Sequence, residues 1–460
     1  MALNIVIMAA GKGTRMRSAR PKVLHALAGR PLLQHVLDAA AGLGAERTIV
    51  VTGHGGDAVE RQMAGAHLAF VRQEPQLGTG HALQQAAPLL GGGDDDTTLI
   101  LNGDVPLIES RTLRTLVDAC AGARLALLTV QLDDPHGYGR IVRSASGAAI
   151  EAIVEEKDAT AAQRAVHEVY TGAMAAPTGA LRRWLAALRN DNAAGEFYLT
   201  DIVAMAVAEG VVVTAAAAGS ETEVLGVNSA AQLADLERRH QRATAERLMA
   251  SGVRLADPAR IDVRGELICG SDIEIDVGCI FEGRVELGDG VRVGAYCMLR
   301  NASVAAGATL RPYTHIDGEG LGVSVGSGAI VGPFARLRGG AVLGSDVHVG
   351  NFVEVKNATL GAGAKANHLA YIGDATLGAR VNFGAGAIVA NYDGANKHRT
   401  VVGDDAHIGS NAVLVAPVEV GAAATVGAGS TIARDAPAGQ LTVARARQSS
   451  LAGWKRPTKG

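Results

Sequence analysis

The 460-residue sequence has few aromatic residues and no excess of positive charge. Phenylalanine, tryptophan and tyrosine together make up 3% of the chain, and its formal net charge at pH 7 is −3. A surface that binds nucleic acid usually combines a basic field with aromatic side chains on which bases stack. Because this sequence provides neither, we expect no nucleic-acid partner.

Paired cysteines and long apolar segments are also lacking. The sequence has four cysteines, Cys120, Cys269, Cys279 and Cys297. None forms a C-x-x-C pair, so we expect buried reduced thiols rather than a zinc site or a disulfide framework. The first ten residues are apolar without a basic leader, and Glu209 and Gly210 interrupt the alanine-rich stretch 204–218. We therefore predict a soluble, cytoplasmic protein with no membrane partner.

Residues 1–228 alternate between short apolar segments and longer segments with helical periodicity. The expected strands are Leu3–Ala9, Thr48–Thr52, Thr98–Asn102 and Leu125–Val130. The expected helices include Pro31–Gly42 and Ser110–Ala121. This alternation predicts a Rossmann-like α/β domain whose mixed, mostly parallel sheet carries helices on both faces. Ligands of such sheets bind beyond the carboxyl ends of the strands.

Residues 229–251 have the pattern of one long helix, which we interpret as a linker between two domains. The segment begins with Ser229, a residue type that caps helices, and it stops at Gly252.

From about residue 260 onward, an aliphatic residue followed by glycine recurs in steps of six. The pairs are Leu287-Gly288 and Val293-Gly294, Val325-Gly326 and Val331-Gly332, Leu343-Gly344 and Val349-Gly350, Leu377-Gly378 and Phe383-Gly384, Val402-Gly403 and Ile408-Gly409, and Val420-Gly421 and Val426-Gly427. Hexapeptide periodicity is typical of a parallel β-helix with inward-pointing aliphatic residues. We expect the glycines at tight corners, with positive φ. A β-helix over residues 252–460 follows, with a glycine-rich β-sandwich as the alternative.

A glycine-rich turn follows the first expected strand. Gly11 and Gly13 would let the backbone approach a phosphate closely, with free amides pointing at the anion. The turn is not a Walker A loop, and Met16 stands where G-x-G-x-x-G requires a third glycine. Such a turn is structural as often as functional, but Arg15 and Lys22 add fixed cations for a triphosphate.

Several segments of the first half resemble the sugar-1-phosphate nucleotidyltransferases. They are M-A-A-G-K-G-T-R-M at 8–16, P-K-V-L at 21–24, Q-E-P-Q-L-G-T-G-H-A at 73–82, N-G-D-V-P-L at 102–107 and G-Y-G-R-I at 137–141. Together with the hexapeptide repeat, they make essentially the whole chain similar to the bacterial bifunctional N-acetylglucosamine-1-phosphate uridyltransferase/glucosamine-1-phosphate acetyltransferase family.

This resemblance implies acetylation of glucosamine 1-phosphate by acetyl-CoA, followed by Mg²⁺-dependent uridylyl transfer from UTP. The implied nucleotide and sugar contacts are Met8, Ala9, Ala10, Gly11, Lys22, Gln73, Gly78, Thr79, Asn102, Gly103, Asp104, Gly139, Glu155, Tyr170 and Asn228. Gln73 would read the uracil edge, and Asp104 and Asn228 would bind Mg²⁺. Taken alone, Asp104 could equally cap a turn. Tyr170 stands where the family commonly has asparagine, so we expect altered hydrogen bonding to the sugar there.

A second motif, K-A-N-H-L-A-Y-I-G-D at 365–374, interrupts the repeat and resembles the family's acetyltransferase motif. A lone histidine in a repeat protein is more often a surface or wall residue, but the motif implies that neutral His368 takes a proton from the attacking amine. Glu354 is a candidate carboxylate near the substrate amine or near His368. The implied glucosamine-phosphate contacts are Arg338, Lys356, Tyr371, Asn382, Asn391 and Tyr392. The implied acetyl-CoA contacts are Ala385, Asn391, Tyr392, Ser410, Ala428 and Arg445.

The resemblance also concerns assembly and loop lengths. The family's left-handed β-helix normally forms a homotrimer that binds acetyl-CoA between neighbouring prisms. Residues Ile316–Gly328 are longer than the family pattern, so we expect a bulge or an external loop there.

Two other functions are open from the residues alone. In the first, the protein is a nucleotidyltransferase whose β-helix serves only in regulation or oligomerisation. The His368 motif argues against this function, and a lack of acetyl transfer would favour it. In the second, the β-helix is a zinc hydratase or a structural trimer scaffold. Zinc would require three convergent histidines, for which His348, His368 and His407 are the candidates, and stoichiometric zinc would favour this function.

Overall fold

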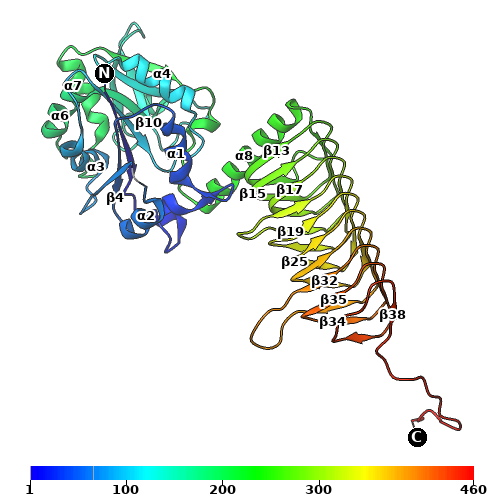
Figure 1. Cartoon of the computed structure of the whole chain (residues 1–460). Coiled ribbons are helices and arrows are strands. Elements are labelled where there is room, and N and C mark those ends of the chain that lie inside the picture. The colour runs from blue at the N-terminus through cyan, green and yellow to red at the C-terminus, as the bar shows by residue number, and fades with distance from the viewer. Residues whose placement is uncertain (1, 66, 460) are drawn as a thin grey trace. The chain divides into compact units, whose positions relative to one another are not determined.

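The computed structural model describes residues 2–65 and 67–459, and the chain divides into two compact units between His240 and Gln241. We call residues 1–240 the α/β unit and residues 241–460 the prism. In Figure 1 the first is a sheet flanked by helices, and the second is a stack of short strands in successive coils. The division falls inside helix α8 (Ala230–Ala250). Within the described ranges, no helix is both long and apolar enough to cross a membrane.

The α/β unit is built on a nine-stranded sheet with the order β11-β7-β10-β6-β1-β4-β5, to which β8 and β9 are joined through β10. Its strands are β1 (Leu3–Ala9), β4 (Arg47–Thr52), β5 (Leu68–Arg72), β6 (Thr97–Asn102), β7 (Leu125–Gln131), β8 (Gly139–Arg143), β9 (Ile150–Val154), β10 (Glu168–Pro177) and β11 (Val213–Ala217). β10 runs antiparallel to β6 and β7, whereas β1 is parallel to β4 and β6. The predicted mixed α/β sheet is confirmed.

Helices cover both faces of this sheet. They are α1 (Leu32–Ala41), α2 (Gly56–Met63), α3 (Thr79–Ala86), α4 (Ser110–Cys120), α5 (Ala161–Arg164), α6 (Thr178–Ala187) and α7 (Ile202–Ala208). Ile5 and Ile7 of β1 pack in the layer that contains α1, α2 and α4, whereas Val6 packs in the layer that contains α3, α6 and α7. Successive side chains of a strand point to opposite faces, so a continuously apolar strand is buried on both sides. Ligands therefore have access mainly at the strand ends.

The prism consists of coils whose strands pair in parallel with those of the next coil. One face contains β12 (Arg254–Leu255), β14 (Glu274–Ile275), β16 (Arg292–Val293), β18 (Thr309–Leu310), β21 (Ile330–Val331), β24 (His348–Asn351), β27 (Lys365–His368), β30 (Asn382–Phe383), β33 (His407–Ile408), β36 (Thr425–Val426) and β38 (Leu441–Thr442). A second face contains β19 (His315–Asp317), β22 (Arg336–Arg338), β25 (Glu354–Lys356), β28 (Tyr371–Gly373), β31 (Ile388–Ala390), β34 (Val413–Val415) and β37 (Thr431–Ile432).

A third face contains β20 (Val323–Val325), β23 (Val342–Leu343), β26 (Thr359–Leu360), β29 (Ala375–Leu377), β32 (Thr400–Val402) and β35 (Val418–Val420). Three longer strands, β13 (Ile261–Cys269), β15 (Cys279–Leu287) and β17 (Met298–Val304), begin the stack. β17 pairs with both β19 and β20 and so joins the second and third faces. The β-helix predicted from the hexapeptide repeat is confirmed, and the β-sandwich alternative is wrong.

The repeat glycines have a role different from the one expected. The aliphatic residues before them are buried, as expected, but among the glycines of the predicted pairs only Gly332 has a positive φ, of 98°. At Gly326, a Cβ atom would lie 2.4 Å from the backbone of Gly344 in the next coil. Glycine is therefore needed because adjacent coils approach closely, whereas the positive φ values fall mostly at other positions of the coil.

Two segments depart from the regular coils. Residues 318–322 form a turn between β19 and β20, which is the loop expected within Ile316–Gly328. Residues 391–399, which we call the 391–399 loop, lie between β31 and β32 and contain an antiparallel bridge between Tyr392 and Lys397. No repeat signal in the sequence predicted this loop.

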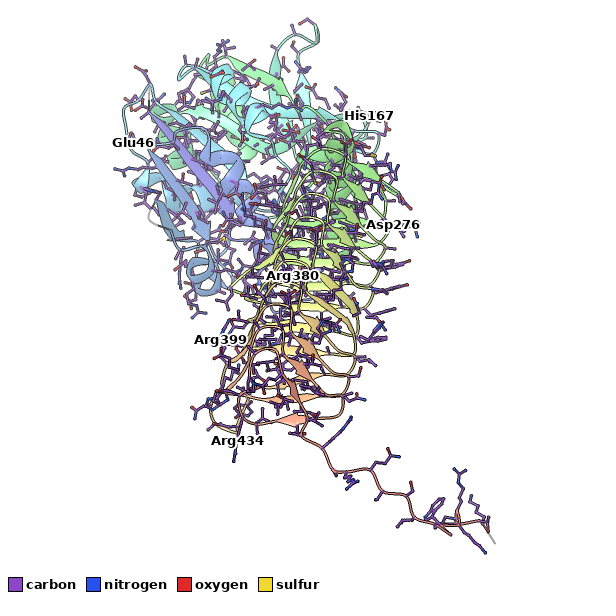
Figure 2. All side chains as sticks on the ribbon, turned by 45° about the vertical axis from the view of Figure 1, so that its right-hand side comes forward. Glu46, His167, Asp276, Arg380, Arg399 and Arg434 are labelled. Atoms are coloured by element: carbon purple, nitrogen blue, oxygen red, sulfur yellow. The ribbon has the colours of Figure 1, made fainter. Side chains whose placement is uncertain are left out.

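The interior of the prism is apolar and includes two buried thiols. Cys279 and Cys297 are both free, and burial raises their pKa values to about 12 and about 11. These thiols are therefore protonated and unreactive at neutral pH. Charged side chains such as those of Asp276 and Arg434 lie on the outside (Figure 2).

Candidate active sites

A cleft lies at the carboxyl ends of β1 and β6 in the α/β unit. Its first cavity, of about 480 Å³, is lined by the glycine-rich turn after β1 and by residues around the start of α3. The predicted residues in this lining are Met8, Ala9, Ala10, Gly11, Lys22, Gln73, Gly78, Thr79, Asn102 and Asp104. Gly103 is absent from the lining, and its backbone N–H donates to Met8 O at 2.9 Å.

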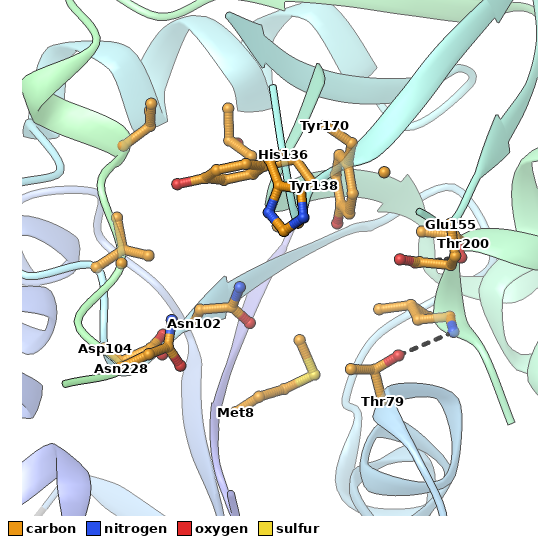
Figure 3. Close-up of a pocket in the computed structure, with 18 of the residues that line it drawn as sticks. Met8, Thr79, Asn102, Asp104, His136, Tyr138, Glu155, Tyr170, Thr200 and Asn228 are labelled. Carbon is orange, nitrogen blue, oxygen red and sulfur yellow. Dashed lines mark hydrogen bonds between the residues drawn. The ribbon is translucent and has the colours of Figure 1, made fainter. Parts of the chain in front are cut away.

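A second cavity, of about 430 Å³, adjoins the first and shares Met8, Thr79, Asn102 and Asp104 with it. The other predicted residues in its lining are Arg15, Gly139, Glu155, Tyr170 and Asn228. Figure 3 shows Asp104 and Asn228 together at one end of this cavity, with Glu155 and Thr200 at the other. The fold thus brings the predicted nucleotide and sugar residues, Gly103 excepted, to one cleft.

Gly13 allows the glycine-rich turn to lie against Lys22. It has a φ of 60°, which glycine adopts without strain, and a Cβ atom there would lie 2.9 Å from Lys22 Cβ. At Gly11 a Cβ atom would meet no other heavy atom within 4 Å. Gly13 therefore shapes the turn, and open space beside Gly11 allows an anion to approach the backbone.

Asp104 and Asn228 converge on one cation. The Lys22 ammonium donates to Asn228 Oδ1 at 3.0 Å and forms a shorter contact with Asp104 Oδ2. Asp104 lies just after β6, and the backbone N–H of Val227 donates to Asp104 O at 2.9 Å, which ties the segment before α8 to this edge of the sheet. Two oxygen atoms from segments far apart in the chain therefore face a position that attracts positive charge.

The other end of the second cavity contains a half-buried carboxyl group and an unpaired phenol. Thr200 Oγ1 donates to Glu155 Oε1 at 3.0 Å, but burial still raises the pKa of Glu155. Tyr170 is 8% exposed, and burial raises its pKa well above the usual value. Its hydroxyl has no hydrogen-bond partner among the described residues. Because an unpaired buried hydroxyl costs about 1–3 kcal/mol, a polar ligand group that bonds to it would be stabilised.

Gln73 and Arg140 have partners within the protein. The Gln73 side chain is buried and donates to Gly78 O at 2.8 Å, which fixes the segment before α3. Arg140 is also buried, pairs with Glu156 at 2.6 Å and donates to Tyr138 O. The Arg140 guanidinium lowers the pKa of the Glu156 carboxyl. These contacts give Gln73 and Arg140 a structural role in the walls of the two cavities.

In the prism, successive coils align a column of residues at one corner. The column, which we call the His368 column, consists of Asn351, His368, Ala385, Ser410 and Ala428. Neighbouring coils are joined here by backbone hydrogen bonds, such as that from Gly386 N to His368 O at 3.2 Å. Arg445 donates to Ala428 O at 2.5 Å and so lies at the end of the column. The predicted base and four predicted acetyl-CoA contacts therefore share one edge.

Three cations cluster on the second face of the prism. Arg338 and Lys356 end β22 and β25, which pair in register. Lys397 of the 391–399 loop lies beside Lys356 and lowers its pKa, and burial and the charge of Arg338 lower it further. Clustered like charges attract anions, so this position suits a phosphate.

A buried carboxylate anchors the 391–399 loop. Asp374 is 8% exposed, and its two oxygens accept hydrogen bonds from the side-chain amides of Asn357, at 2.6 Å, and Asn391. The backbone of Thr400, just after the loop, donates to Asp374 O at 3.2 Å. The predicted contact Asn391 is thereby fixed to the wall of the prism.

Other predicted contacts are more dispersed within the chain. Tyr371 begins β28, whereas Asn382 begins β30 on a different face. Tyr392 is exposed, and its hydroxyl donates to Gly394 O at 2.6 Å. Among the described residues, no hydrogen bond or ion pair links these three side chains to Arg338 or Lys356.

His368 has a partner that the sequence did not indicate. Its Nδ1 atom lies 2.8 Å from Asn351 Oδ1. Glu354, the candidate carboxylate, instead contacts Arg338 at 3.1 Å and Arg336 at 3.5 Å. The structure therefore pairs the imidazole with an amide and the carboxylate with arginines.

The register also separates the three histidines considered for zinc. His348 and His407 lie in one column with two coils between them, and His368 lies in another. Across residues 2–65 and 67–459, no group of three or more His, Cys, Asp or Glu side chains is placed to hold a metal ion.

Sequence reasoning missed several residues that complete these sites. His136 and Thr200 line the second cavity, and Lys397 joins the cation cluster. Thr200 lies in a segment without a recognised motif, so only the fold reveals it. His136 directly precedes the G-Y-G-R-I segment, and Lys397 lies close after Tyr392, so proximity to a motif is the one signal that the sequence offered.

Comparisons with known proteins agree with this arrangement. Residues 5–190 match the model of the MobA-like NTP transferase domain, and residues 399–434 match that of the bacterial transferase hexapeptide with six repeats. The fold and its two sites define a nucleotidyltransferase domain followed by a hexapeptide-repeat transferase domain.

Full-length relatives narrow the class to one family. The bifunctional protein GlmU of Methylibium petroleiphilum is 70% identical over 463 residues, which cover 99% of each chain. That of Acidovorax sp. (strain JS42) is 64% identical over 473 residues, which cover 100% of this chain and 99% of that protein. That of Azoarcus sp. (strain BH72) is 60% identical over 457 residues, which cover 99% of this chain and 100% of that protein. The chain belongs to the GlmU family, as the sequence motifs predicted.

Proposed function

We propose that this chain makes UDP-N-acetylglucosamine in two reactions, with acetylation of glucosamine 1-phosphate on the prism and uridylyl transfer in the cleft. The observation that carries the function is membership of the bifunctional GlmU family along the whole chain, which confirms the prediction of an acetyltransferase and uridylyltransferase. The residue assignments below are proposals that rest on the geometry of the two sites.

In the uridylyl reaction, a phosphate oxygen of N-acetylglucosamine 1-phosphate attacks the α-phosphorus of UTP, and pyrophosphate leaves. The nucleophile is already an anion, so the protein supplies no general base. Arg15 and Lys22 neutralise phosphate charge, while the backbone at Gly11 holds the anion in place. Glu155 and Tyr170 contact the sugar, since the first accepts and the second has an unused donor.

The cofactor of this reaction is Mg²⁺, with Asp104 and Asn228 as its protein ligands. Their oxygen atoms fit the ion because both already converge on the Lys22 ammonium, and because Mg²⁺ needs few protein oxygens when it keeps its waters. When bound, the ion neutralises charge that develops on the phosphates. Lys22 then remains available for the phosphates themselves.

In the acetyl reaction, the amine of glucosamine 1-phosphate attacks the thioester carbon of acetyl-CoA. The new C–N bond forms as the C–S bond breaks, the amine proton passes to His368, and the CoA sulfur leaves and takes up a proton. Arg338, Lys356 and Lys397 attract the sugar phosphate. Acetyl-CoA lies along the His368 column, and Arg445, Asn391 and Tyr392 provide its remaining contacts. Tyr371 and Asn382 complete the sugar-phosphate contacts.

A homotrimer is the proposed assembly, and an exposed row of aromatic rings supports it. Tyr296, Tyr313, Phe334 and Phe352 stack in successive coils, with ring centroids 5.3, 5.0 and 5.5 Å apart. Each ring is 48–57% exposed in the single chain. An apolar surface of this kind is suited to be covered by a second copy of the chain. Sedimentation velocity would detect a species of about three chain masses, and a monomer at micromolar concentration would contradict the proposal.

We place these reactions in the cytoplasm, where the reduced state of the four free cysteines is expected. Neither a nucleic acid nor a membrane is part of the proposal.

One incubation tests the function. Purified protein receives glucosamine 1-phosphate, acetyl-CoA, UTP and Mg²⁺, and the products are identified by mass spectrometry. We expect free CoA thiol, pyrophosphate and UDP-N-acetylglucosamine, with pyrophosphate lost when EDTA replaces Mg²⁺. Release of neither thiol nor pyrophosphate would overturn the proposed function, and pyrophosphate release that persists in EDTA would overturn only the cofactor.

A further inference from the structure

His368 and Asn351 lie on neighbouring coils in direct register. β24 pairs with β27 so that Asn351 stands opposite His368, and Leu369 N donates to Asn351 O at 3.1 Å. The coils approach closely here, since a Cβ atom at Gly350 would lie 2.0 Å from Asn367 O. Glycine before Asn351 therefore allows the approach that brings its amide within 2.8 Å of the imidazole.

The chemistry of this contact selects one form of the imidazole. The Asn351 atom that faces Nδ1 is the carbonyl oxygen Oδ1, which carries no hydrogen and can only accept. A neutral imidazole bonded in this way has its proton on Nδ1, so the lone pair is on Nε2. His368 is exposed, whereas Asn351 is partly buried, so the amide fixes one side of the ring and leaves the other accessible.

We propose that Asn351 is a positioning residue for acetyl transfer, which holds His368 in the tautomer and orientation that leave Nε2 free to accept the amine proton. This inference rests on the proposed role of His368 as general base. An amide suits the task because it orients the ring without adding a charge. A carboxylate in this place would also accept the bond from Nδ1 and orient the ring, although it would add a charge that stabilises the protonated form.

The test compares Asn351→Ala with Asn351→Asp in the full chain, and both activities are measured in each variant. Asn351→Ala removes the acceptor, so kcat for acetyl transfer should fall about 10- to 100-fold. This loss does not exceed the roughly 10²–10⁴-fold contribution of a general base, because the variant misplaces the base but keeps it. KM for acetyl-CoA and glucosamine 1-phosphate should stay within about twofold. Uridylyl transfer should be unchanged, which controls for unfolding. Asn351→Asp keeps an acceptor oxygen and should restore most of the lost kcat.

Spectroscopy reads the tautomer of His368 directly in the wild-type protein. In ¹⁵N-histidine-labelled wild-type protein, the magic-angle-spinning signal absent from His368→Ala identifies His368, and at pH 8 its Nδ1 should be the protonated nitrogen. A proton on Nε2 instead would overturn the inference. Unchanged acetyl kcat in Asn351→Ala, or no recovery in Asn351→Asp, would do the same.

These outcomes separate the inference from the function on which it rests. If His368→Ala retains acetyl transfer, the base assignment itself is wrong. If His368→Ala loses it while Asn351→Ala retains it, only the positioning role is wrong.

Discussion

The cleft and the His368 column assemble their residues in different ways. The cleft gathers side chains from Met8 to Asn228, on strands, a helix and loops whose spacing along the chain has no period. The column places Asn351, His368 and Ala385 at intervals of 17 residues, because each coil stacks in register on the one before. Position in the column is thus set by the repeat, whereas position in the cleft depends on the whole sheet.

The two regions also treat carboxyl groups that are withdrawn from solvent differently. Glu155 in the cleft has one hydroxyl partner, and burial raises its pKa. Asp374 in the prism is more deeply buried, but both of its oxygens accept hydrogen bonds from amides. A carboxyl group with spare bonding capacity beside a cavity is available to a ligand, whereas one that is fully bonded stabilises the wall. The predictions below test this contrast and the independence of the two sites.

The largest expected effect is that of His368→Ala on acetyl transfer. Loss of a general base should lower kcat for this reaction by about 10²–10⁴-fold, because the amine must then lose its proton to water. Uridylyl transfer should be spared, since His368 lies in the prism and the cleft lies in the α/β unit. Thiol release and pyrophosphate release, assayed separately, provide the measurement. Equal loss of both activities would contradict independent sites.

Asp104→Asn should have the opposite selectivity. Replacing the carboxylate weakens the proposed metal position, so uridylyl transfer should fall about 100-fold or more while acetyl transfer is unchanged. Raising the Mg²⁺ concentration should recover part of the rate. An unaltered dependence of the rate on Mg²⁺ in this variant would count against Asp104 as a ligand.

Much of the prism could be predicted from the sequence because its constraints are local and repeated. The buried aliphatic positions, such as Val331 and Ile408, follow from the period alone. The role of the glycines does not follow from the period, because a Cβ atom at Gly326 would meet the next coil rather than its own coil. The 391–399 loop and Lys397 were also missed, since an insertion carries no periodic signal.

In the cleft, motifs predicted the residues but not their partners. Lys22, Asp104 and Asn228 were expected near phosphate and metal, yet their mutual contacts depend on chain segments far apart. Thr200 was missed because no local pattern marks a hydroxyl that meets Glu155 through the fold. Sequence reasoning also placed Glu354 near the substrate amine or His368, whereas the coil register gives His368 an amide and Glu354 contacts Arg338. Contacts across elements are what a single sequence leaves undetermined.

Asp374→Ala should destabilise the prism by about 2 kcal/mol, because it leaves the buried amide of Asn391 and the exposed amide of Asn357 without their acceptor. Asp405→Ala is the matched control, since Asp405 also has a positive φ (57° against 49°) but pairs on the surface with Arg380. Urea unfolding followed by circular dichroism measures both. The 391–399 loop should also become more sensitive to protease in Asp374→Ala alone, and equal effects of the two variants would remove the anchoring role.

The smallest expected effect is a pH-dependent gain in stability from Glu155→Gln. Burial raises the pKa of Glu155, with smaller contributions from nearby carboxylates such as Asp201, so the folded state favours the protonated form. The contribution of this group to stability is therefore full below its usual pKa near 4.5 and is lost as the pH rises through the raised value.

Glutamine does not ionise and can still accept the bond from Thr200. The midpoint of thermal unfolding, followed by fluorescence of the buried Trp184, should thus rise by a few °C at most at pH 8 and by nothing at pH 4. A variant that is less stable than the wild type at pH 8 would show that the ionised carboxylate stabilises the empty cleft, and the contrast with Asp374 would then disappear.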